Sequence, residues 1–207
     1  MIIGALAIHS MHASSLHAEE LALVAHARDQ RLTEFATGRA LLRQLLKTSA
    51  PIVRASNGAP EWPQGVVGSL AHDQTNAVAA IGPTDRYRAI GIDIEHHEHG
   101  NGQSDDELRE SVLRADDPDI DPITAFVVKE AAYKAWSQLG GEIIGPLAVH
   151  IHIDGNKFTA EMPDETAIGG NFVDTGDSWL AVAVVYQVLG TSSSEEEFLE
   201  VPLRLCG

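Results

Sequence analysis

The sequence IGIDIE, at residues 90–95, lies in a short apolar segment rich in β-branched residues, which predicts a β-strand. Residues two apart in a strand point to the same side, so Asp93 and Glu95 would present two carboxylates together at the strand end. Magnesium prefers oxygen ligands and is commonly held by one or two carboxylates together with substrate phosphates. Taken alone, the segment could equally be two solvated acids at the end of a strand.

A second charged motif, FVVKEAAYK at residues 126–134, falls within a predicted helix over residues 123–139. Pro122 precedes this helix, and two glycines at 140–141 end it. Glu130 and Lys134 stand four residues apart on one helix face, with Lys129 beside them. A third carboxylate and two ammonium groups are the components that a pyrophosphate site needs, although an ordinary surface Glu/Lys pair has the same spacing.

Outward from these motifs, the pattern predicts a mixed chain of helices and short strands. Strands at residues 76–81 and 89–94 are expected to pair across the turn GPTD. A helix is predicted over residues 17–47, with Gly38 as the point where it divides, and residues 51–68 are predicted to be loop. The polar stretch 96–121 is predicted to be a loop with one short helix at 108–114, followed by antiparallel strands at 149–153, 157–161 and 179–188.

Composition limits the function. Thirty acidic residues against 14 basic ones give 207 residues a formal charge of −16, which disfavours nucleic acid and anionic membranes as partners. The longest apolar stretches, 1–8 and 179–186, are far shorter than a membrane span of roughly 20 residues. With one cysteine, Cys206, no internal disulfide can form, so a cytoplasmic protein is expected. A phosphate-rich ligand would need a local group of basic residues or a bound cation.

Taken together, the two motifs resemble the signature motifs of the Sfp-type 4′-phosphopantetheinyl transferases. Two further segments, RLTEFATGR at 31–39 and GAPEWPQGVVGSLAH at 58–72, are similar to the branch that includes the enterobactin-synthase and mycobacterial enzymes. The resemblance runs in order over residues 31–136. It implies an α+β fold of two pseudo-symmetric halves, residues 1–95 and 96–207, each a small antiparallel sheet packed with a long helix. The two halves would form one functional unit with coenzyme A in the cleft between them.

The resemblance also implies the reaction and its residues. The chain would transfer the 4′-phosphopantetheine arm of coenzyme A to a serine of an apo acyl or peptidyl carrier protein, releasing adenosine 3′,5′-bisphosphate. Carriers of secondary metabolism, such as siderophore or polyketide assembly, are the expected partners, and a monomer is expected. The implied metal ligands for Mg²⁺ are Asp93, Glu95 and Glu130, and the implied catalytic residues are Glu130 and Lys134. The implied coenzyme A-binding residues are Arg31, Arg39, Arg54, Ser69, His72, Lys129 and Lys134.

Some features depart from this pattern or leave alternatives open. Ala71 stands where the family usually has serine or threonine, and Asp73 where this branch often has cysteine. The general base could be Glu130 or a metal-bound water. A catalytically idle protein that binds coenzyme A or a carrier, or a metal-dependent phosphoesterase, would use the same acids. The histidine-rich run at 96–99 could be read as a transition-metal site, but a polar loop is the simpler interpretation.

Overall fold

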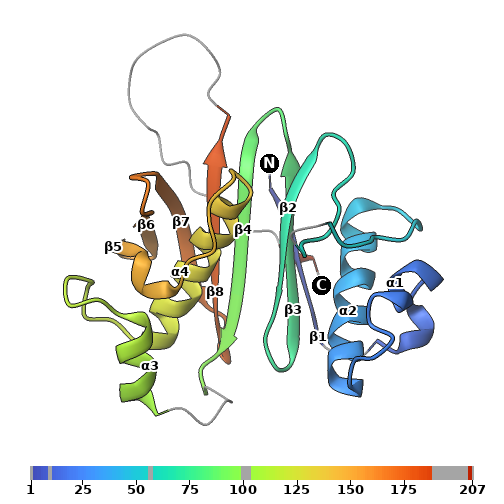
Figure 1. The fold of residues 1–207 in the computed structure, drawn as a ribbon, viewed down its shortest axis with the longest axis horizontal. Helices are drawn as coiled ribbons and strands as arrows, with labels where there is room; N and C mark the ends of the chain where they lie inside the picture. The colour runs from blue at the N-terminus through green and yellow to red at the C-terminus, as the bar shows by residue number, and fades with distance from the viewer. Residues whose placement is uncertain (1, 9–10, 56–57, 99–103, 188–204, 207) are drawn as a thin grey trace.

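A computed structural model describes residues 2–8, 11–55, 58–98, 104–187 and 205–206. The fold is α+β, as predicted, with two β-sheets and the long helices packed outside them (Figure 1). The first sheet has the order β2-β3-β1-β9, and its three longer strands are antiparallel, while β9 runs parallel to β1. The second sheet has the order β4-β8-β7-β6-β5 and is antiparallel throughout.

The elements follow one another along the chain with short connections. The strands are β1 (Ile3–Ile8), β2 (Val66–His72), β3 (Asn76–Pro83), β4 (Tyr87–His96), β5 (His150–Asp154), β6 (Lys157–Glu161), β7 (Ala167–Asp174), β8 (Ser178–Tyr186) and β9 (Leu205–Cys206). The helices are α1 (Ala18–Ala22), α2 (Asp29–Leu46), α3 (Asp105–Val112) and α4 (Pro122–Ser137), with 3-10 turns at Ala13–Ser15 and Pro146–Ala148.

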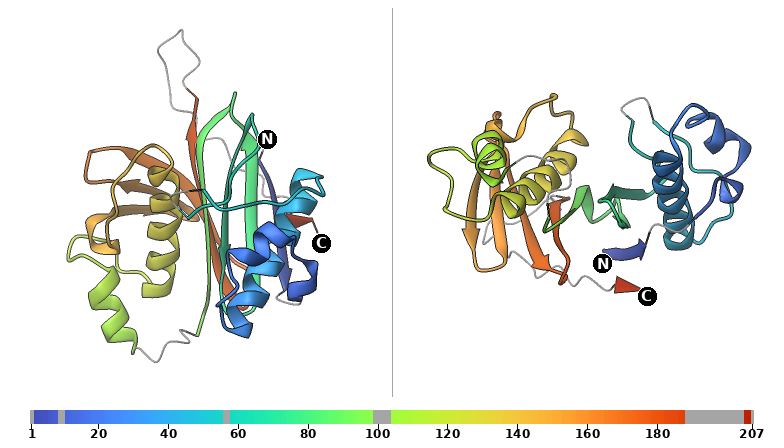
Figure 2. Two further views of the ribbon diagram at one scale, coloured as in Figure 1. Left: turned by 45° about the vertical axis from the view of Figure 1, so that its right-hand side comes forward. Right: turned by 90° about the horizontal axis from the view of Figure 1, so that it is seen from below.

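Four layers result from this arrangement, and the views of Figures 1 and 2 agree on their order. Helix α2 covers the outer face of the first sheet, where it packs against Ala77 and Ala79 of β3. The opposite face of β3 contributes Val78 and Ala80 to a core shared with β4 and β8. Helix α4 covers the other face of the second sheet, over residues such as Ala183. Each inner strand is therefore apolar on both sides.

Glycine at position 91 allows α4 to lie directly on β4. A Cβ atom at Gly91 would stand 1.8 Å from the carbonyl oxygen of Ala131, a separation that real atoms do not adopt. The same contact is bonded on both sides by Gln138, whose side-chain amide donates to the Ile90 carbonyl at 2.6 Å. The helix start is set by Asp121, whose carboxylate accepts from the Thr124 amide, with Pro122 in the first turn. This close packing places the second charged motif over the first.

Several sequence expectations are wrong in detail. The strands at 76–81 and 89–94 exist, but β3 and β4 belong to different sheets and are not hydrogen-bonded to each other. Gly38 does not divide α2: it is buried within it, and a Cβ there would lie 3.0 Å from Leu70. The actual break is at residues 23–28, between α1 and α2. The predicted boundary at residue 95 remains a prediction, and β4, which spans it, pairs with β8 of the second sheet.

Candidate active site

The carboxylate of Asp93 is the most buried of the predicted acidic groups. It lies near the end of β4, with 6% of the residue exposed. One oxygen, Oδ1, accepts a hydrogen bond from the Lys134 ammonium on α4 at 2.6 Å, and that ammonium also donates to the Ile92 carbonyl at 3.3 Å. The other oxygen, Oδ2, is buried and has no hydrogen-bond partner among the described residues. Since buried acceptors are normally satisfied, this unused lone pair indicates room for a further ligand.

Glu95 and Glu130 complete an acidic cluster around Asp93, and their pKa values show that the three carboxylates repel one another. Burial, reinforced by the charges of Asp93 and Asp73, raises the pKa of Glu95 to about 7. Burial and the charge of Asp93 also raise the pKa of Glu130, despite the opposing effect of Lys134. The pKa of Asp93 itself is raised by burial, which outweighs the attraction of Lys134. A divalent cation would relieve this repulsion.

These residues fit a hard divalent cation. Two carboxylates come from one strand, with Asp93 and Glu95 two residues apart, and Glu130 comes from the helix packed on that strand. All three supply oxygen atoms, which Mg²⁺ prefers, and the unpartnered Asp93 Oδ2 is an available donor. The cluster could therefore hold such an ion, with Lys134 as a second positive charge at its edge.

Asp73 is a fourth carboxylate near this cluster that sequence reasoning treated only as a departure from the family pattern. It follows β2 and is 6% exposed. Its Oδ1 accepts from the backbone amides of Thr75 and Asn76, and its Oδ2 accepts from the Ser178 hydroxyl at 2.9 Å. Although burial opposes it, these hydrogen bonds hold the pKa of Asp73 below its ordinary value. Asp73 therefore connects the first sheet to β8 beside the predicted metal ligands.

Basic groups meet on the other side of the Asp73 backbone. The Arg31 guanidinium on α2 donates to the His72 ring nitrogen Nε2 at 2.7 Å and to the Glu34 carboxylate at 3.1 Å. Because arginine only donates, His72 accepts at Nε2. His72 and Asp73 are consecutive, so the arginine-bearing helix and the acidic cluster meet at the end of β2. The predicted nucleotide and pyrophosphate sites are therefore neighbours in space.

Arg39 and Arg54 share one aromatic neighbour. The guanidinium of Arg39 lies 4.2 Å from the Phe35 ring centroid, and that of Arg54 lies 5.8 Å from it. Arg39 is 3% exposed, and its Nε has no hydrogen-bond partner among the described residues. Burial first, and then the positive charges of Arg54 and Arg31 among others, lower the pKa of Arg39 to about 10. A buried, incompletely satisfied guanidinium among like charges favours the approach of an anion.

Two predicted coenzyme A-binding residues lie elsewhere. Lys129 is fully buried, and its ammonium donates to the Val112 carbonyl at 2.8 Å and to Asp117. This ion pair turns Lys129 away from Glu130 and Lys134, so the structure does not support a phosphate-binding role for it. Ser69 is buried on the face of β2 that also carries Val67 and Ala71, toward β4, whereas His72 contacts α2 residues on the other face.

Comparisons with known proteins agree with this geometry. A family model described as "4'-phosphopantetheinyl transferase N-terminal domain" matches residues 19–82. The 4'-phosphopantetheinyl transferase PptT of Mycobacterium tuberculosis is 34% identical over 74% of this chain and 73% of its own length. The 4'-phosphopantetheinyl transferase Svp of Streptomyces mobaraensis is 32% identical over 90% of this chain and 84% of its own. The Npt enzyme of Nocardia iowensis, of the same description, is 34% identical over 75% and 71%. This chain belongs to the 4′-phosphopantetheinyl transferase family.

Proposed function

We propose that this protein transfers the 4′-phosphopantetheine arm of coenzyme A to a serine hydroxyl of an apo carrier protein and releases adenosine 3′,5′-bisphosphate. The observation that carries the proposal is the buried Asp93 carboxylate, with Lys134 on one oxygen and the other oxygen unpartnered. Asp93, Glu95 and Glu130 would hold Mg²⁺, which when bound neutralises charge on the pyrophosphate. Carriers of secondary metabolism, for example polyketide or siderophore assembly, are the expected partners of a monomeric, cytoplasmic enzyme.

The basic groups divide the work of binding coenzyme A. Arg39, Arg54 and Arg31 surround a region of positive charge that suits the 3′-phosphate end of the nucleotide. His72 lies against Arg31 and beside the acidic cluster, where it would contact the nucleotide between its two ends. Lys134 would bind a pyrophosphate oxygen as the Asp93 pair rearranges. These contacts supply the local positive charge that the overall charge of −16 lacks.

Glu130 is the proposed general base. Its position on α4 beside Asp93 places it at the reacting end of the site, and its raised pKa makes it a stronger proton acceptor than an ordinary glutamate. The serine oxygen forms a bond to the β-phosphorus, the bond from that phosphorus to the bridging oxygen breaks, and the hydroxyl proton passes to the Glu130 carboxylate. Phosphoryl transfer of this kind depends mainly on positioning and charge.

Intact mass of an apo carrier protein, incubated with the enzyme, coenzyme A and Mg²⁺, tests the proposal. We expect the carrier to gain one phosphopantetheine with wild type, and no measurable gain with Glu130→Gln. Glu142→Gln, a matched change at an exposed position just beyond α4, is the control and should retain wild-type turnover. Near-normal turnover of Glu130→Gln would contradict its role. Binding of coenzyme A without transfer to any carrier would instead favour an idle binding protein.

A further inference from the structure

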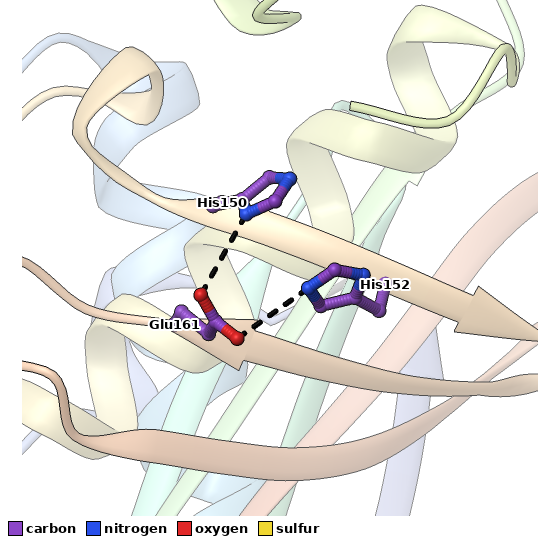
Figure 3. A group of neighbouring side chains, drawn as sticks. All are labelled: His150, His152 and Glu161. Atoms are coloured by element: carbon purple, nitrogen blue, oxygen red, sulfur yellow. Dashed lines mark ion pairs between the residues drawn. The ribbon is translucent and has the colours of Figure 1, made fainter. Parts of the chain in front are cut away.

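A group of three metal-binding side chains lies outside the proposed active site, on the exposed edge of the second sheet. His150 and His152 are two residues apart on β5, and Glu161 on β6 is directly opposite His150 in the antiparallel register. Their neighbours Ile151, on β5, and Ala160, on β6, are buried against the α4 side. Strand alternation therefore sends all three polar side chains to the opposite, solvent-facing side, as Figure 3 shows.

The distances within this group are those of a metal site. His150 Nδ1 lies 3.7 Å from Glu161 Oε2, and His152 Nε2 lies 3.4 Å from Glu161 Oε1. One ligand atom from each residue lies within 4.8 Å of the others. Bonds of about 2.0–2.1 Å to a tetrahedral ion place its ligands roughly 3.3 Å apart, so small side-chain rotations would bring all three onto one ion.

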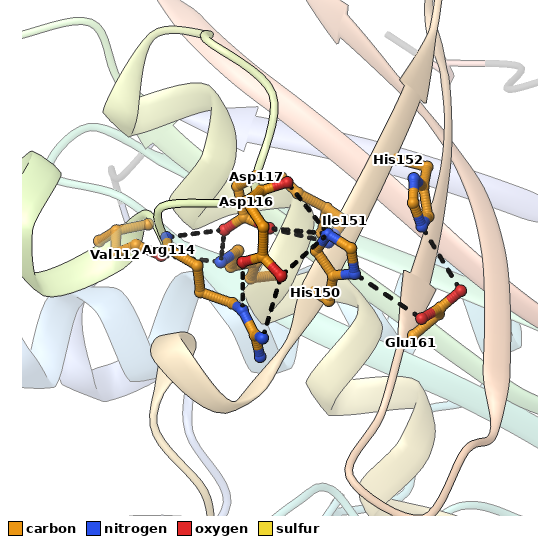
Figure 4. A network of polar contacts seen from close by, with 9 residues as sticks. Val112, Arg114, Asp116, Asp117, His150, Ile151, His152 and Glu161 are labelled. Atoms are coloured by element: carbon orange, nitrogen blue, oxygen red, sulfur yellow. Dashed lines mark hydrogen bonds and ion pairs between the residues drawn. The ribbon is translucent and has the colours of Figure 1, made fainter.

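The surrounding structure holds His150 in the orientation a ligand needs. Its Nε2 lies 3.2 Å from the backbone carbonyl oxygen of Asp116, which makes Nε2 the protonated nitrogen and leaves the Nδ1 lone pair facing Glu161. Metal-ligating histidines usually donate their other N–H to such an oxygen. Figure 4 shows this contact within a wider network: the carboxylate of Asp117 accepts from the Ile151 amide at 3.1 Å, beside His150.

The network is anchored in the protein core. Asp117 is fully buried as a side chain and pairs with the buried Lys129 ammonium of α4. It also accepts from the Arg114 amide at 3.0 Å. Although burial acts in the opposite direction, these donors hold the pKa of Asp117 below its ordinary value, so it stays an anion. The loop that carries Asp116 is therefore fixed relative to β5 before any ion binds.

We propose that His150, His152 and Glu161 form a second metal site, for a transition-metal dication of the Zn²⁺ class. Two imidazoles and one carboxylate suit zinc, nickel or cobalt, whereas Mg²⁺ prefers oxygen ligands alone. Three protein ligands leave at least one coordination position open to water or another ligand. The net charge of −16 favours cation binding at any exposed acidic surface.

This site is separate from the acidic cluster at Asp93. The strand order β4-β8-β7-β6-β5 places β5 four strands away from β4, which is about 19 Å at roughly 4.8 Å per strand. The two sites also differ in their donors, with three carboxylates at one and two imidazoles with one carboxylate at the other. Saturating Mg²⁺ should therefore leave Zn²⁺ binding at the histidines unchanged.

Equilibrium dialysis of the full chain against Zn²⁺ in excess Mg²⁺ tests the proposal. We expect one Zn²⁺ per chain in wild type and a loss of affinity of at least tenfold in both His152→Ala and Glu161→Gln. The His152 side chain is 59% exposed, so its removal should leave the fold intact, which circular dichroism checks. Asp154→Ala, an exposed acid on the same strand, is the matched control and should bind Zn²⁺ as wild type does.

A second readout follows from linkage, because an ion that binds only the folded state raises the unfolding temperature. Zn²⁺ should raise that temperature in wild type and in Asp154→Ala, and not in His152→Ala. Equal Zn²⁺ affinity in wild type and His152→Ala would overturn the proposal and assign the binding to other histidines, such as those at 96–97. Displacement of the bound Zn²⁺ by Mg²⁺ would also overturn it.

Discussion

Replacing Glu95 by glutamine should stabilise the metal-free protein while removing a proposed metal ligand. The pKa of Glu95 is raised to about 7 from an ordinary value of 4.5, chiefly by burial and then by the charges of Asp93 and Asp73. At about 1.4 kcal/mol per pKa unit, ionising this carboxylate in the folded state costs roughly 3 kcal/mol. Glu95 is partly exposed, so solvent screening reduces the expected gain to about 1–2 kcal/mol.

The sign of the effect depends on pH. The folded state holds the Glu95 proton more tightly than the unfolded state does, so stability falls as pH rises between 4.5 and about 7. Glutamine cannot ionise, so the variant should lack this loss. Urea unfolding in EDTA should therefore give nearly equal free energies of unfolding near pH 4.5, and a variant more stable by about 1–2 kcal/mol at pH 8.

Adding Mg²⁺ should reverse the order at pH 8, because the ion stabilises wild type by binding the folded state and binds the variant weakly. Glu98→Gln, the same change at an exposed position three residues further on, is the control and should alter neither curve. A Glu95→Gln protein that is less stable than wild type in EDTA at pH 8 would refute the reasoning. So would a protein whose unfolding responds to Mg²⁺ as wild type does.

Two further substitutions separate structural from binding roles. Lys129→Met should lower the free energy of unfolding by about 3–5 kcal/mol, measured in urea, because it leaves the Asp117 carboxylate buried without its partner. A stable Lys129→Met protein with a raised KM for coenzyme A would restore the predicted phosphate-binding role. Arg39→Gln should raise KM for coenzyme A by about tenfold or more with a smaller change in kcat, measured by steady-state transfer kinetics, since it removes one charged hydrogen-bond donor to phosphate. An unchanged KM would exclude Arg39 from the nucleotide site.

Local patterns predicted the elements that carry the chemistry. The helix expected over residues 123–139 is α4, Pro122–Ser137, and the acidic strand is β4. Both segments carry their own signals, an apolar strand period for one and a proline start with a glycine stop for the other. The spacing of Glu130 and Lys134 then follows from helix geometry alone.

Long-range pairing could not be predicted in the same way. The alanine-rich strand β3 is buried on both faces, so its sequence contains no indication of which side meets which sheet, and its pairing with β4 was predicted wrongly. The cross-strand contact that joins His150 and Glu161 depends on the β5–β6 register, which the sequence does not display. Asp73 likewise acquires its partner, Ser178, from a strand 105 residues away.

The two lysines of α4 show why motif spacing alone does not assign a role. Lys134 lies at the acidic cluster and pairs with Asp93, whereas Lys129 turns inward to Asp117. A residue adjacent to Glu130 is rotated by about 100° around the helix, so it faces a different environment. Lys129 fixes α4 to the loop before it, and Asp117 in turn fixes β5 through Ile151. The buried pair therefore supports the helix that positions Glu130 and the strand that carries the proposed histidine site, and its loss should disturb both.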